Sequence, residues 1–165
     1  MPRKKTPTDK LLVVTRSLID LFSMPFHAVG DTVLTGDAGD ARDARDARRT
    51  ERFLNSFPDP IGAEAFANHY HLEDYVKGLR WQPGGQRRFL MTLAEALVKV
   101  WSERLVRLLG ERSAIFYIGG RDTVFIRFHV ERPGAEPWTS HEPAFIKKER
   151  LRVYRTTGGV VERIA

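Results

Sequence analysis

The chain has 165 residues, of which 42% are hydrophobic, and this is enough material for the core of one domain. It contains no cysteine, which excludes disulfides, thiolate metal sites and a cysteine nucleophile. The formal net charge of +6 favours anionic partners such as nucleic acid, but only mildly.

The first residues are basic, as in a signal peptide, but Arg16 and Asp20 interrupt the apolar run that follows. No window approaches the roughly 20 consecutive apolar residues of a membrane-spanning helix. We therefore expect no signal peptide, no membrane span and a cytoplasmic protein.

The first half of the chain predicts helices separated by irregular segments. A basic tail over residues 1–7 precedes a single domain over residues 8–165, where Thr8 can cap a helix that ends before Pro25. A short strand is expected at 32–34. A repeated Asp-Ala-Arg unit then predicts a solvated linker at about 35–50, with a charged helix as the alternative.

Apolar residues return after this linker and predict three further helices. A short helix at 61–69 follows a proline-marked turn, and a second is expected at 73–80. The third, at 88–109, has apolar residues on one broad face and a C-capping glycine, Gly110. Its apolar positions are Leu90, Leu93, Ala94, Leu97, Val98, Trp101, Leu105 and Leu108. This helix is expected to be the central element of the fold.

Beyond Gly110 the apolar period changes from that of a helix to that of a strand. Residues 115–118 and 124–130 predict one hairpin, and residues 149–155 and 160–164 predict a second. A proline-rich loop from Arg132 to Phe145 separates them. The predicted class is α+β: N-terminal helices, one of them long and central, packed on a C-terminal antiparallel sheet of about four strands.

Residues that could carry chemistry do not form a specific motif. His69 and His71, with Glu73 and Asp74 nearby, could hold zinc, but the spacing matches no established pattern and an ordinary turn is favoured. Ser140, His141 and Glu142 are adjacent in sequence, which does not make a triad. We expect no catalytic site, no metal and no cofactor.

A non-enzymatic binding or regulatory module that acts through a protein partner is the leading functional hypothesis, of the inhibitor, immunity or accessory-factor type. Exposed tryptophan and arginine residues are typical anchors of protein interfaces. The predicted anchors are Trp138 and His141 in the proline-rich loop, Trp81 in a glycine-rich turn, and Arg104, which interrupts the apolar face of the central helix.

The alternative is single-stranded nucleic acid bound on the sheet face that points away from the central helix. Strand alternation would place basic and aromatic side chains on that face, as in surfaces that stack bases and neutralise phosphates. The predicted set is Phe125, Arg127, His129, Lys148, Arg150, Arg152 and Tyr154.

Overall fold

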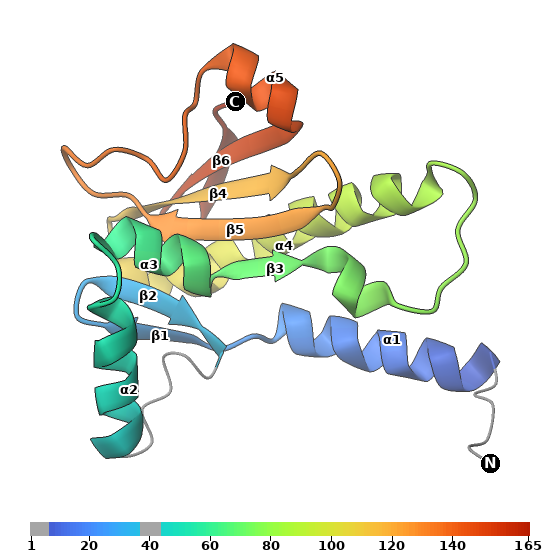
Figure 1. Cartoon of the computed structure of the whole chain (residues 1–165), viewed down its shortest axis with the longest axis horizontal. Helices are drawn as coiled ribbons and strands as arrows, with labels where there is room; N and C mark the ends of the chain where they lie inside the picture. The colour runs from blue at the N-terminus through green and yellow to red at the C-terminus, as the bar shows by residue number, and fades with distance from the viewer. Residues whose placement is uncertain (1–6, 37–43) are drawn as a thin grey trace.

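The computed structural model describes residues 7–36 and 44–165, and Figure 1 shows how their elements are arranged. The helices are α1 (Pro7–Phe22), α2 (Ala44–Leu54), α3 (Pro60–Ala67), α4 (Gly85–Leu109) and α5 (Pro143–Glu149), with a 3₁₀ turn η2 (Leu72–Val76). The strands are β1 (Phe26–Val29), β2 (Thr32–Thr35), β3 (His69–His71), β4 (Ser113–Gly119), β5 (Phe125–Val130), β6 (Leu151–Thr157) and β7 (Val160–Arg163). Residues 1–6 of the predicted basic tail lie outside the described residues.

The long helix α4 crosses one face of a five-stranded antiparallel sheet, whose strand order is β3-β5-β4-β6-β7. We call this face of the sheet the inner face. The buried residues of α4 include Trp101, which packs edge-on against Phe128 of β5. Burial of such large aromatic and aliphatic side chains supplies most of the stabilisation of a core. The predicted α+β class, with a long central helix on a C-terminal antiparallel sheet, is confirmed.

The sheet has one strand more than the four expected, because β3 pairs with β5 at the edge of the sheet. We predicted a turn at this three-residue stretch, since it is too short to show a periodic pattern. The chain that follows forms the 3₁₀ turn η2 and not the helix predicted at 73–80. A separate hairpin, β1–β2, contains the strand predicted at 32–34.

Two stretches that we predicted as irregular are helical. The expected linker at 35–50 is helical from Ala44 onward, where α2 begins. This helix is held to the next segments near its end, because the Phe53 ring contacts Phe57 and Phe66. Residues 37–43 of that linker lie outside the described residues. The proline-rich loop ends in α5, which starts at Pro143, where the missing N–H of proline costs nothing.

None of the helices among the described residues is long and apolar enough to cross a membrane.

Candidate functional site

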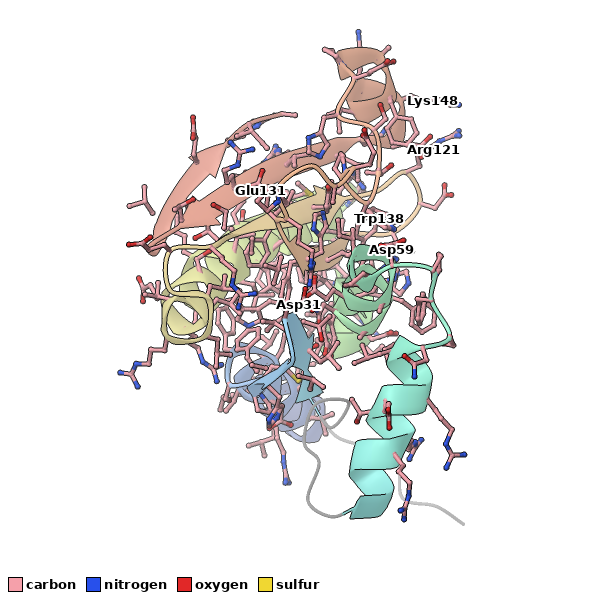
Figure 2. The ribbon with its side chains drawn as sticks, turned by 90° about the vertical axis from the view of Figure 1, so that its left-hand side faces the viewer. Asp31, Asp59, Arg121, Glu131, Trp138 and Lys148 are labelled. Atoms are coloured by element: carbon pink, nitrogen blue, oxygen red, sulfur yellow. The ribbon has the colours of Figure 1, made fainter. Side chains whose placement is uncertain are left out.

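The outer face of the sheet, opposite α4, carries a second apolar cluster of its own. Tyr117 of β4 and Val153 of β6 are buried in it, together with Ile146 of α5. Residues 131–142, α5 and the end of the chain cover these side chains; we call residues 131–142 the outer loop. Figure 2 shows Trp138 on this side of the sheet, with α4 on the other. The outer face is therefore largely an internal surface.

This burial overturns the facing assigned to β6 in the nucleic-acid hypothesis. Arg152 and Tyr154 point to the inner face, where both bond to the Glu95 carboxylate of α4. Leu151 and Val153 lie on the outer face, where the nucleic-acid hypothesis placed Arg152 and Tyr154. Because both faces of this sheet are packed, apolar alternation along β6 did not show which of its two sets of side chains faces α4.

The other predicted nucleic-acid residues do not form a continuous exposed patch either. Phe125, Arg127 and His129 do lie on the outer face, but His129 is only 1% exposed and the Arg127 guanidinium lies under the Trp138 ring. Lys148 belongs to α5, and Arg150 ends that helix in a left-handed conformation, so neither lies on a strand. The predicted stacking surface is absent from the described part of the fold.

The outer loop is attached to the sheet by a cluster of Tyr117, His129 and His141. The Tyr117 hydroxyl lies 3.2 Å from His129 Nε2 and 3.0 Å from His141 Nε2. His129 Nδ1 lies 3.0 Å from the Val130 carbonyl, which can only accept, so Nε2 of the neutral ring is the acceptor for Tyr117. His141 then donates from Nε2 to the tyrosine oxygen. The three side chains form one hydrogen-bonded chain.

Burial sets the protonation of this cluster. It raises the pKa of Tyr117 far above its usual value and lowers the pKa of both His129 and His141. The nearby Arg155 lowers the pKa of His141 further. A neighbouring cavity of about 660 Å³ is lined by both histidines and by the Arg155–Glu131 ion pair. At neutral pH the cluster is uncharged, and it holds His141 in one orientation beside that cavity.

Trp138, the main predicted anchor, is half-buried and packs within its own chain. Its ring lies 3.8 Å from the Arg127 guanidinium carbon and makes an edge contact with Tyr117 at 5.3 Å. Trp81 is also half-buried, and its ring packs on Phe89 at the start of α4. Both tryptophans pack on their own chain and are partly exposed, and their contact with a partner stays a prediction.

Arg104 belongs to α4, and its side chain reaches the C-terminal end of α1. Its guanidinium donates to the carbonyls of Phe22, at 2.8 Å, and Ser23, at 3.3 Å, and lies over the Phe26 ring. The charge therefore stabilises the C-terminal end of α1, where carbonyls lack helical partners. Its stem also lines a shallow groove between α1 and α4.

One side of α1 is apolar and exposed. Leu11 is 58% exposed, Leu12 65% and Ile19 60%, and at about 100° per residue they share one side of the helix with Thr15. We call these four residues the α1 stripe. The adjoining groove, of about 650 Å³, is lined by Thr15, Leu18, Ile19, Phe22, Ser23 and Arg104. A continuous apolar surface of this kind commonly marks an interaction site.

The two histidines considered for zinc lie on β3. His69 Nδ1 bonds to the Arg127 guanidinium, so this nitrogen is not free to bind a metal. Within residues 7–36 and 44–165, no three His, Asp or Glu side chains gather as metal ligands.

Comparison with known proteins gives one family. Residues 2–148 match the Uncharacterized protein PM0498 family, a stretch that runs from the tail before α1 to within α5. The chain belongs to this family. No curated protein and no solved structure matches the chain significantly.

Two features of this PM0498-family protein were missed by sequence reasoning. The spacing of Leu11, Leu12 and Ile19 predicted a helix but said nothing of the exposure of this side. The available signal was that apolar residues at 11–14 are continuous and cannot all face one neighbour. The role of Tyr117 as the bridge between two histidines had no local signal, because its partners lie 12 and 24 residues away.

Proposed function

We propose that the protein is a non-enzymatic binding module that acts through a protein partner, and that the partner docks on the α1 stripe and its groove. The observation that carries this proposal is the exposure of Leu11, Leu12 and Ile19 on one side of a single helix. The proposal includes a cytoplasmic location and a role of the inhibitor, immunity or accessory-factor type.

The chemistry of the stripe indicates what kind of partner fits. The groove beside it is bounded by Leu18 and Phe22, so a partner can insert an apolar side chain next to the stripe. Burying one such large aliphatic side chain contributes about 1.5–3 kcal/mol. Arg104 at the groove end, with its planar guanidinium, favours a partner that carries an acidic or carbonyl group near its apolar anchor.

The test compares the wild type with Leu12→Glu and Ile19→Glu as baits on lysate from native cells. Val13→Glu is the matched control, because Val13 is also exposed, at 49%, but points away from the stripe. We expect one partner that is retained by the wild type and by Val13→Glu and weakened at least tenfold by either stripe variant. All four proteins should have similar melting temperatures.

Two results would contradict this proposal. The first is equal retention of every partner by the stripe variants and the control. The second is that the stripe variants lose binding to lipid vesicles but retain every protein that the wild type retains. The stripe would then be a membrane contact. Cell fractionation tests the location separately.

A further inference from the structure

Arg127, on the outer face, has no acidic partner. The guanidinium groups of Arg132, Arg152 and Arg155 each pair with a carboxylate. In the described part of the chain no carboxylate pairs with Arg127, whose neighbours are the neutral His69 ring and the face of Trp138. A half-buried cation without a counter-anion is costly unless another group supplies the negative charge.

The hydrogen bonds around Arg127 leave two donors without an acceptor. His69 has its pKa lowered to about 4, by burial first and then by the Arg127 charge, so its ring is neutral at pH 7. Nδ1 accepts from Arg127, which places the ring proton on Nε2. This Nε2 and the Nε of Arg127 are both buried and have no partner among the described residues. One N–H group on each of these two side chains therefore lacks an acceptor among the described residues.

A cavity of about 440 Å³ lies against His69, and its lining includes two carboxylates, Asp122 and Glu149, but not Arg127 itself. His69 and Trp138, which both contact the guanidinium, form part of its wall, and Phe125, Phe145 and Leu151 supply apolar surface. Arg121 and Lys148 lie towards the α5 end of the same side of the molecule, as Figure 2 shows. The volume is within the range of small-molecule sites, which are mainly apolar with a few polar groups that fix orientation.

We propose that this cavity binds a small molecule that carries a planar ring and an oxyanion, either a carboxylate or a phosphate. The ring packs on Trp138 and Phe125, and the oxyanion accepts hydrogen bonds from Arg127 and His69. Carboxylate and phosphate oxygens accept short, strong hydrogen bonds from charged N–H donors such as the Arg127 guanidinium. Since Trp138 and His69 separate the guanidinium from the cavity, the Trp138 ring moves when the ligand binds. This site does not involve α1.

The test uses benzoate, phenyl phosphate and inorganic phosphate as probes, each titrated at constant ionic strength with chloride as the balancing anion. Binding is measured by the intrinsic tryptophan fluorescence, to which Trp138 contributes, and, independently, by the rise in melting temperature. We expect saturable binding of benzoate or phenyl phosphate to the full-length protein, and the better of the two identifies the oxyanion. Arg127→Met should weaken this binding at least tenfold. Arg107→Met is the matched control and should bind as the wild type does, because Arg107 is an exposed residue of α4, on the other side of the sheet.

Three outcomes of this experiment would reject the inference. Absence of saturable binding by both ring-bearing probes would overturn it, as would equal binding by Arg127→Met and the wild type. Equal binding of inorganic phosphate and phenyl phosphate would also overturn it, because the ring would then contribute nothing. If Arg127→Met does not fold, His69→Phe, which removes the second donor but keeps a ring, replaces it with the same expected loss.

Discussion

Glu64→Gln is expected to be among the most destabilising single substitutions in this protein. The Glu64 side chain is fully buried in α3 and accepts four hydrogen bonds. Two come from the backbone N–H groups of Val33, at 2.7 Å, and Val130, at 2.8 Å. The other two come from the Arg132 guanidinium, at 2.8 and 3.1 Å. One carboxylate thus connects α3 to β2, to β5 and to the start of the outer loop.

The expected loss of unfolding free energy is large because glutamine cannot accept the same four hydrogen bonds. Its amide has one oxygen, so the –NH₂ group of the variant faces at least one donor that loses its acceptor. The Arg132 charge also loses its buried counter-ion. Burial raises the pKa of Glu64, and Arg132 with the two backbone donors opposes that rise, so the carboxylate depends on these four contacts. Removing one partner of such a pair costs about 3–5 kcal/mol, out of a typical total of about 5–15 kcal/mol.

Urea unfolding monitored by tryptophan fluorescence measures this loss, since Trp101 is fully buried. At about 2–4 °C per kcal/mol for a domain of this size, the melting temperature should fall by roughly 10 °C. Asp31→Asn is the matched control, because Asp31 also pairs with Arg132 but its side chain is 66% exposed, and we expect a loss below about 0.5 kcal/mol. A loss below about 1 kcal/mol for Glu64→Gln would refute the reasoning.

Three further predictions follow from local geometry. The pKa of His69 is about 4 in the folded state and 6.5 in the unfolded state. The contribution of the neutral His69 ring to stability is therefore complete above pH 6.5 and is lost as the pH falls towards 4. The urea midpoint of His69→Gln should depend less on pH over this window than that of the wild type. Gly119→Ala would place a Cβ 2.3 Å from the Arg150 carbonyl oxygen at φ +114°, and should cost about 3 kcal/mol in urea unfolding, whereas Gly134→Ala, with open space around it, should cost about 1 kcal/mol. Arg104→Met removes two hydrogen bonds to the last carbonyls of α1 and should cost about 1–2 kcal/mol, with faster amide exchange confined to that helix end; unchanged exchange there would contradict the capping role.

Much of the fold was readable from local pattern. The helix at 88–109 and the strands at 115–118 and 124–130 have long or strict periods, and a glycine ends the helix at the expected position. The candidate site was much less predictable. Arg127 and Trp138 were chosen for their residue types, but their stacking on each other depends on an outer loop whose path has no periodic signal.

Local patterns were enough to predict the α+β class, the central helix and the alternation along residues 124–130, because these depend on residues a few positions apart. The packing of the whole fold settled which face of β6 points to α4. It likewise decided that three residues after α3 join the sheet, and that α1 keeps one apolar side exposed. The physical reason is common to all three. Each depends on what a distant segment covers: α5 and the outer loop bury the outer face, β5 pairs with the short strand, and no described segment covers the α1 stripe.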